Sequence, residues 1–327
     1  MLSNLPEIQD EILSWFSQHR RDLPWRHTRD PYAILVSEIM LQQTQVDRVL
    51  PYWHAWMERW PTVHELAAAP VAEVIRAWKG LGYNRRAVNL QRAAQAVVDR
   101  GGEFPQTIDE LLTLPGIGPY TAGAIACFAY EQDVPFIDTN MRRVLHRIFV
   151  GVDLPKPTVS DKEVLVIAAE AIPAGNGWLW NQAIMEFGAI QCTSRKPLCL
   201  TCPVQSHCSA FPEIQLALAI TARQPKGKAV PFEQTNRYFR GRIMDELRAH
   251  EGDGVMLAEM GPAVKAGFAS TDYPWLLELI EALAGDGLLV IETHPVPKER
   301  LELISGVAES SVQYDATPVE EIRVRLP

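Results

Sequence analysis

Four cysteines lie close together near residue 200, with the spacing C-x6-C-x2-C-x5-C: Cys192, Cys199, Cys202 and Cys208. Thiols this close form disulfides or hold a metal. Met1 is followed by polar sequence without the apolar segment of a secretory signal, so we expect a reducing compartment. The odd cysteine count, completed by Cys127 in an apolar stretch, agrees with that expectation. The cluster therefore predicts a metal site.

The spacing distinguishes between metals. Structural zinc sites usually combine two short cysteine pairs, and here only Cys199 and Cys202 are spaced that way. One contiguous run with four thiolates favours a [4Fe–4S] cluster. A zinc ion, or no metal at all, remains the alternative.

Two carboxylates stand in apolar surroundings. Glu38 lies within Ile34–Leu41, and Asp138 directly follows an apolar stretch. Burial of a carboxylate is costly and raises its pKa, which suits a general acid. The structural alternatives are an N-cap for the helix after Asp138 and an ion pair between Glu38 and Arg26.

A turn with two glycines, Gly116 and Gly118, separates two expected helices within Leu114–Thr121 (LPGIGPYT). Glycine lets an anion approach the unpaired backbone N–H groups at the start of the second helix, where the helix dipole favours negative charge. A DNA phosphate would fit there. An ordinary turn between packed helices is the alternative.

The elements that must position these residues are mainly helical. No alternating strand pattern occurs before residue 228, and residues 213–235 are predicted to form a linker. Residues 239–249 and 274–284 predict helices, and 288–292 a short strand. This order is typical of a small winged-helix-like module over residues 236–327. A helical lid or partner-binding tail is the alternative.

The net charge of −9 is unevenly distributed. Residues 1–228 carry 22 Lys and Arg against 23 Asp and Glu, whereas residues 229–327 carry 9 against 17. We expect the acidic tail to contribute little to phosphate binding. Basic clusters occur earlier, and are solvated helix faces or phosphate contacts: Arg85 with Arg86, then Arg142, Arg143 and Arg147, then Arg195 with Lys196. No apolar run is long enough to predict a membrane span.

Taken together, the hairpin, the aspartate 18 residues after Tyr120 and the four-cysteine run resemble the helix-hairpin-helix DNA glycosylases that carry a [4Fe–4S] cluster. Within that superfamily the chain is similar to MutY-type adenine glycosylases over residues 5–212. Four further motifs carry this similarity: Leu23–Arg26 (LPWR), Ser37–Gln45 (SEIMLQQTQ), Gly80–Tyr83 (GLGY) and Asn181–Ala189 (NQAIMEFGA).

The resemblance implies a mainly α, two-lobed helix-hairpin-helix glycosylase fold. A six-helix barrel lobe would span residues 21–131, and residues 1–20 with 132–212 would form the iron–sulfur lobe. Double-stranded DNA with a mismatch or oxidative lesion would be the substrate, and the target adenine would be flipped out. We expect a cytoplasmic monomer, associated with the nucleoid when bound to DNA. A protein partner for the C-terminal module is a further expectation.

The resemblance also implies roles for individual residues. Glu38 would protonate the leaving base, and Asp138 would stabilise the sugar cation. Tyr120 occupies the position at which bifunctional relatives carry a Schiff-base lysine, so a monofunctional enzyme is expected. The remaining roles are these: Asn140 beside Asp138; Trp25, Arg26 and Gln182 in the adenine pocket; Gln43 and Tyr83 as wedges in the duplex; Gly116, Gly118, Arg195 and Lys196 at phosphates.

Three departures from the family pattern leave alternatives open. Residues 229–327 do not resemble the Nudix-like domain with which the family reads 8-oxoguanine, Asn84 replaces a second tyrosine, and Thr139 replaces a glycine. A glycosylase for thymine or another mismatched base, and a non-catalytic DNA-binding protein, are the competing interpretations. The SEIMLQQ segment around Glu38 argues against the former, and the presence of both Glu38 and Asp138 against the latter.

Overall fold

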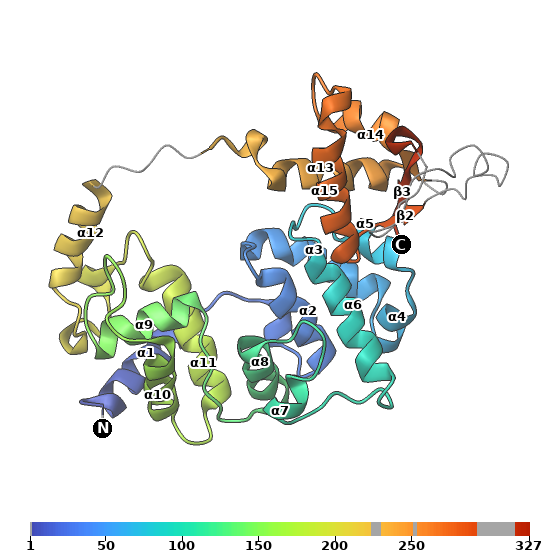
Figure 1. Ribbon diagram of the computed structural model, residues 1–327. Helices are drawn as coiled ribbons and strands as arrows, with labels where there is room; N and C mark the ends of the chain where they lie inside the picture. The colour runs from blue at the N-terminus through green and yellow to red at the C-terminus, as the bar shows by residue number, and fades with distance from the viewer. Residues whose placement is uncertain (1, 224–229, 251–253, 293–317) are drawn as a thin grey trace, which may run out of the picture. The chain divides into compact units, whose positions relative to one another are not determined.

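Helices dominate the structure, a computed structural model that describes residues 2–223, 230–250, 254–292 and 318–327 (Figure 1). The chain divides into two compact units: Met1–Val63 with Ala96–Gly227, and His64–Gln95 with Lys228–Pro327. Residues 64–95, expected in the barrel lobe, thus group with the C-terminal residues; the lobe boundaries given above stay a prediction. Among the described helices, none combines the length and hydrophobicity needed to span a bilayer.

The first unit carries the residues expected to do chemistry. Its principal helices are α1 (Leu5–His19), α2 (Pro31–Leu41), α3 (Val46–Arg59), α7 (Ile108–Leu111), α8 (Pro119–Tyr130), α9 (Thr139–Phe149), α10 (Asp161–Ala171), α11 (Gly177–Glu186) and α12 (Glu213–Arg223). Short helical turns are Pro24–Arg26, Phe187–Gln191, Cys199–Thr201 and Gln205–His207.

Two almost fully apolar helices form the centre of this unit. α2 is buried from Tyr32 to Met40, and α8 from Thr121 to Ala129, and the two helices pack against each other. Such an all-apolar pattern predicts a buried helix. The side chain of Asp30 caps α2 by accepting hydrogen bonds from the backbone N–H groups of Tyr32 and Ala33. Glu38 is thereby fixed inside the core on a rigid element.

The second unit combines three helices of the N-terminal half with the C-terminal module. Its elements are α4 (Val63–Ala68), α5 (Val71–Ala77), α6 (Arg85–Val98), a turn at Phe232–Gln234, α13 (Asn236–Ala249), β1 (Val255–Met256), α14 (Leu257–Val264), a turn at Ser270–Asp272, α15 (Tyr273–Gly285), β2 (Val290–Glu292), a turn at Val319–Glu321 and β3 (Arg323–Arg325).

The C-terminal module runs helix, strand, two helices, then two strands, which is a winged-helix order, and it contains the two helices and the strand expected at 239–249, 274–284 and 288–292 (Figure 1). The sheet order is β1-β3-β2, antiparallel throughout, with Val324 opposite both Val255 and Ile291. Ile75 of α5 and Val88 of α6 belong to the same apolar core as Ile243 and Leu247 of α13. The module therefore has no separate core, and its buried face is shared with α5 and α6.

Candidate active site and metal centre

A cavity of about 950 Å³ opens in the first unit and gathers most of the expected site residues. All the residues expected to act in catalysis or to bind the base line it, together with Gln43: Glu38, Tyr120, Asp138, Asn140, Trp25, Arg26 and Gln182. These residues come from five separate stretches of chain, brought together by the packing of α2, α8, α9 and α11.

Glu38 is the buried acid of this cavity. Its carboxylate oxygen Oε2 accepts a 2.7 Å hydrogen bond from the Tyr120 hydroxyl. Burial, with a further contribution from the negative charge of Asp138, raises the pKa of Glu38 to about 7, although the hydrogen bond from Tyr120 opposes the shift. Near neutral pH, a large fraction of the Glu38 side chains therefore carries a proton. The ion pair with Arg26, considered above, does not form, because Arg26 pairs with Glu186 instead.

Tyr120 is positioned by the hairpin that precedes α8. Its ring packs edge-on against Phe136, with 5.6 Å between the ring centroids. Burial, assisted by the nearby carboxylates, raises the pKa of Tyr120 well above its ordinary value. The phenol therefore stays protonated and donates its hydrogen bond to Glu38. With no amine at this position, an imine to the sugar cannot form.

Asp138 combines a structural role with a place in the cavity. One carboxylate oxygen accepts from the backbone N–H groups of Asn140 (3.0 Å) and Met141 (2.7 Å), which is the N-cap of α9. The other oxygen accepts from the Asn140 side-chain amide at 3.0 Å. The N-cap interpretation is therefore correct, and it fixes the carboxylate at the cavity wall.

A largely buried ion-pair network lines another part of the cavity. Glu186 accepts hydrogen bonds from both Arg21 and Arg26, and its side chain is only 1% exposed. Burial opposes ionisation of Glu186, but the two arginines hold its pKa at about 2. Arg26 also donates from Nε to Gln182 Oε1 at 2.8 Å. This wall of the cavity, where the base pocket is expected, is thus fixed by charge-assisted hydrogen bonds.

Sequence reasoning missed Arg21 and Glu186, which both line the cavity. A signal for Glu186 was available, because Gln182 and Glu186 are four residues apart on α11 and so lie on the same helix face. Trp25 completes this wall, and its ring lies 6.0 Å from that of Trp53 in an edge-on contact.

The two expected wedge residues share an unusual backbone conformation. Gln43 has φ +58° and Tyr83 φ +47°, two of four non-glycine residues in the left-handed region within the described parts of the chain. For a residue other than glycine, this backbone conformation is less favourable by about 1 kcal/mol or more of free energy. Gln43 lines the cavity, whereas Tyr83 belongs to the second unit and is 46% exposed. Strained backbone is common at ligand-contacting positions.

The hairpin glycines lie in the turn before α8. Gly116 has φ +75°, a conformation that favours glycine, and Gly118 is the N-cap of α8 with open space beside its α-carbon. Among the described residues, no backbone or side-chain acceptor is bonded to the N–H of either glycine. The turn can therefore receive an anion at the helix N-terminus, as the sequence predicts. The phosphate role itself stays a prediction.

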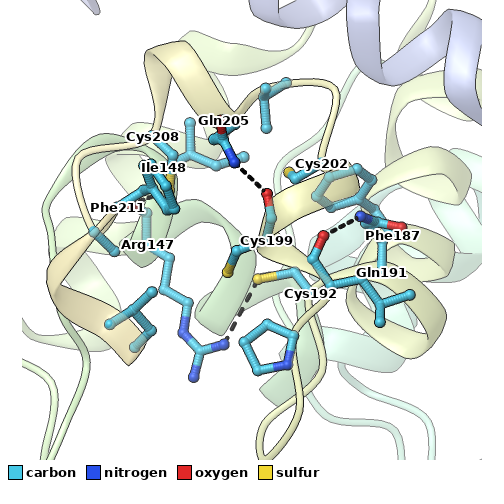
Figure 2. A pocket seen from close by; sticks show the side chains of 15 residues that line it. Arg147, Ile148, Phe187, Gln191, Cys192, Cys199, Cys202, Gln205, Cys208 and Phe211 are labelled. Carbon is cyan, nitrogen blue, oxygen red and sulfur yellow. Dashed lines mark hydrogen bonds between the residues drawn. The ribbon is translucent and has the colours of Figure 1, made fainter. Parts of the chain in front are cut away.

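The four clustered cysteines line one pocket, shown in Figure 2. They come from the end of the Phe187–Gln191 turn and from the two short turns after it. Burial raises the pKa of Cys202 to about 12 and also raises those of Cys192 and Cys208. Within the described residues, no three His, Cys, Asp or Glu side chains converge on one point that could hold a single metal ion.

Neighbouring side chains fix the cysteine segment. The buried Arg147 points its guanidinium at Cys192 Sγ, 3.7 Å away (Figure 2). It also bonds to Asp153 and to the Thr193 carbonyl. Gln205 donates to the Cys199 carbonyl at 2.7 Å. A cation beside the sulfur stabilises a thiolate, so this donor set fits an iron–sulfur group. Arg195 and Lys196 are exposed on the loop between Cys192 and Cys199.

The basic cluster Arg142, Arg143 and Arg147 is not a single surface patch. Arg147 is buried, and Arg143 is directed inward, where it donates to the Asn140 side chain and to the carbonyls of Gly188 and Cys192. Arg142 pairs with Asp161 at 3.1 Å. For Arg143 and Arg147, both interpretations given above were therefore wrong: each is an internal hydrogen-bond donor near the metal segment.

Comparison with known proteins decides the family. Residues 36–169 match the model of HhH-GPD superfamily base excision DNA repair proteins, and residues 192–208 match the iron–sulfur binding domain of endonuclease III. An adenine DNA glycosylase of Mycolicibacterium smegmatis is 45% identical over 245 residues, which cover 73% of this chain and 79% of that one. The chain belongs to the adenine DNA glycosylase family. It carries a [4Fe–4S] cluster, and its four clustered cysteines all lie within the residues that match the iron–sulfur binding domain.

Solved structures agree with this family and with the fold predicted from sequence. A thermostable thymine-DNA glycosylase is 33% identical, with a TM-score of 0.59, and the match covers 64% of this chain and 97% of that one. Endonuclease III in a non-covalent DNA complex is 25% identical, with a TM-score of 0.55, over 64% of this chain and 96% of that one. Both matches confirm the helix-hairpin-helix glycosylase fold.

Proposed function

We propose that this chain is a monofunctional adenine DNA glycosylase of base excision repair. The observation that carries the proposal is the pair of carboxyl groups in one cavity: a buried Glu38 with a pKa of about 7, and an Asp138 fixed by three hydrogen bonds. A glycosidic bond breaks most easily when one carboxyl group is protonated and the other is not.

The reaction follows from these positions. The target adenine leaves the base stack and enters the cavity, since its glycosidic bond cannot be reached inside the duplex. Glu38 transfers its proton to a ring nitrogen of adenine while the bond from the sugar C1′ to N9 breaks and its electron pair goes to the base. Asp138 faces the resulting sugar cation. Water then adds to C1′ and loses a proton, which leaves an abasic site and an intact strand.

The base pocket supports recognition of a purine. Arg26 donates to Gln182 Oε1, so the amide NH₂ of Gln182 is left to donate to a ligand. Glu186 in turn fixes Arg26, which limits the rearrangement needed when a base binds. Trp25 supplies an aromatic wall. Gln43 and Tyr83 wedge into the duplex from which the base has left, and Arg195 and Lys196 contact phosphates.

The [4Fe–4S] cluster, when bound, links residues 192–208 covalently and so orders the loop that carries Arg195 and Lys196. Its proposed role is structural. Double-stranded DNA is the partner, and endonuclease III, a structural relative, is solved in complex with DNA. We further propose that the chain acts as a cytoplasmic monomer on adenine opposite 8-oxoguanine or guanine. A protein partner of the C-terminal module remains part of the proposal.

A glycosylase assay on four duplexes tests the proposal, with A:8-oxoG, A:G, T:G and U:G as the target pairs. We expect excision from the first two and none from the others. Excision of thymine would favour the competing assignment, for which the likeness to a thymine-DNA glycosylase is the supporting observation. Binding to all four duplexes without excision from any would identify a non-catalytic DNA-binding protein.

A further inference from the structure

The expected wedge residue Tyr83 is in contact with the C-terminal module. The guanidinium carbon of Arg237, on the first turn of α13, lies 4.3 Å from the centroid of the Tyr83 ring. Arg248, further along α13, donates to the Asn84 side chain at 2.9 Å and to the Ile75 carbonyl at 3.2 Å. Both contacts lie within the second unit. Asn84, a departure from the family pattern, is thus an attachment point for the module.

Arg237 differs from the other arginines of α13. Arg240 pairs with Asp286, Arg248 pairs with Asp245, and Arg242 donates to the Ala263 carbonyl. Arg237 is exposed and forms no ion pair with any described residue. The first turn of α13 carries no acidic side chain, so Arg237 adds its charge to the positive end of the helix dipole. This positive charge is uncompensated beside Tyr83.

The rest of the module is unsuited to phosphates. In a helix-turn-helix fold, the second helix of the pair usually enters the DNA groove. In this module the pair is α14 and α15, so the second helix is α15, and the charged residues that it exposes are Glu278 and Glu281. Repulsion between these carboxylates and the DNA backbone opposes that mode of binding. Although residues 229–327 are acidic overall, Arg237 therefore provides a local positive charge at the beginning of α13.

We propose that Arg237 binds a backbone phosphate of the DNA strand next to the point where Tyr83 enters the duplex. The inference rests on the proposed function, which supplies the duplex and the wedge. A guanidinium held against the Tyr83 ring is pre-oriented, and it reaches the groove edge when the ring enters. Phosphate oxygens supply the anion that the described residues lack, through a charge-assisted hydrogen bond. The C-terminal module thus contributes to DNA affinity through α13, without sequence preference.

The test is fluorescence anisotropy with two labelled duplexes, one with an A:8-oxoG pair and one fully paired, over a range of salt concentrations. For Arg237→Ala we expect about tenfold weaker binding to both duplexes near 0.1 M salt. The slope of log K against log salt should become shallower by about one unit. Arg242→Ala, which removes an exposed arginine of the same helix away from Tyr83, is the matched control and should keep the wild-type slope.

Arg237→Lys distinguishes phosphate binding from ring stacking, because it keeps the charge and loses the planar guanidinium. We expect it to retain the wild-type slope. An unchanged slope for Arg237→Ala would overturn the inference, and would leave an acidic protein partner as the occupant of this edge. Single-turnover excision by the wild-type protein, measured on the same A:8-oxoG duplex, tests the proposed function independently. A wild-type protein that binds but does not excise would refute the function and leave the slope comparison valid.

Discussion

Arg143 donates a 2.8 Å hydrogen bond to the side-chain oxygen of Asn140, whose amide in turn donates to Asp138. The same guanidinium donates to the backbone carbonyl of Cys192, the first of the four clustered cysteines, at 2.8 Å. Gly188 permits this arrangement, because a Cβ at that position would lie 2.8 Å from the Asn140 Cβ. The Asp138 carboxylate is therefore connected through Asn140 and Arg143 to the segment that carries the clustered cysteines.

We expect Arg143→Ala to lower the adenine excision rate by about tenfold or more, since Asn140 and Asp138 lose their support. Arg143→Lys should be similarly impaired, because an ammonium group cannot reproduce the forked set of bonds. Iron content and the single-turnover rate are measured together. A lower rate with full iron content locates the effect at Asn140 and Asp138, whereas a lower rate with less iron reflects loss of the cluster. Arg100→Ala, at an exposed arginine bonded to Thr113, is the control. An Arg143→Ala protein with the wild-type rate would contradict the structural role.

The pH dependence of excision should follow Glu38. Because the pKa of Glu38 is about 7, the protonated acid is lost as the pH rises above 7, and the rate should then fall about tenfold per pH unit. The Tyr120 hydroxyl lowers this pKa by its hydrogen bond, so Tyr120→Phe should move the descending limb to higher pH. Single-turnover rates between pH 6 and 9 measure this. A profile that is flat over this range would exclude Glu38 as the acid.

Two buried carboxyl groups make opposite contributions to stability. The pKa of Glu38 is raised from 4.5 to about 7 on folding, so its contribution to stability is lost between those values as pH rises. The Glu38→Gln protein should therefore have a free energy of unfolding roughly 3 kcal/mol higher than wild type at pH 8.

The pKa of Glu186 falls from 4.5 to about 2 on folding, so its stabilisation is present above pH 4.5 and lost as pH falls toward 2. Glu186→Gln should accordingly destabilise the protein at pH 7, by about 3–5 kcal/mol, because the buried Arg26 is left without its counter-ion and the half-exposed Arg21 loses the same partner. Urea unfolding at pH 4, 6 and 8 compares both variants with wild type. If Glu38→Gln and wild type differed in unfolding free energy by the same amount at every pH, the pKa of Glu38 would not change on folding, and this prediction would be wrong.

Much of the site could be predicted from sequence, because its residues sit in short, distinctive segments. The four cysteines and the apolar helix around Glu38 are local patterns, and so is the N-cap at Asp138. The pairing of Arg26 with Glu186 is not local: the two residues are 160 positions apart and meet only when α11 packs beside the Pro24–Arg26 turn. Side-chain direction is also invisible in sequence, which is why Arg143 and Arg147 read as part of a charged surface.

The C-terminal module illustrates the same limit. Two of its helices and the strand at 288–292 could be predicted from sequence, whereas β1, α14 and β3 were not predicted. Its attachment through Arg248 to Asn84, and the shared core with Ile75 and Val88, depend on contacts between distant segments. The net charge of residues 229–327 predicts an acidic tail, but it does not show that Arg237 and the exposed acids of α15 lie on different helices.

The cysteines make separable predictions. Cys199→Ala should lose the iron and the brown colour of the cluster, with its broad absorbance near roughly 400 nm, and should unfold at lower temperature. Cys127→Ala should retain about four irons per chain, because Cys127 is buried on α8 and bonded to Asn181, outside the cluster segment. Iron and zinc analysis of the purified proteins checks both. Stoichiometric zinc without iron in the wild-type protein would contradict the cluster assignment.

The product of the reaction tests the roles of Asp138 and Tyr120. Asp138→Asn removes the negative charge facing the sugar cation, yet asparagine still caps a helix, so the fold should persist while excision falls by about 10²–10⁴-fold. With Tyr120 donating to Glu38 and no lysine in its place, the wild-type product should be an intact abasic strand that breaks only after alkali. Borohydride should trap little covalent protein–DNA complex. Denaturing gels with and without alkali, and with borohydride, separate these outcomes. Strand cleavage without alkali would mean that an amine elsewhere in the chain attacks the sugar, and the monofunctional mechanism would then be wrong.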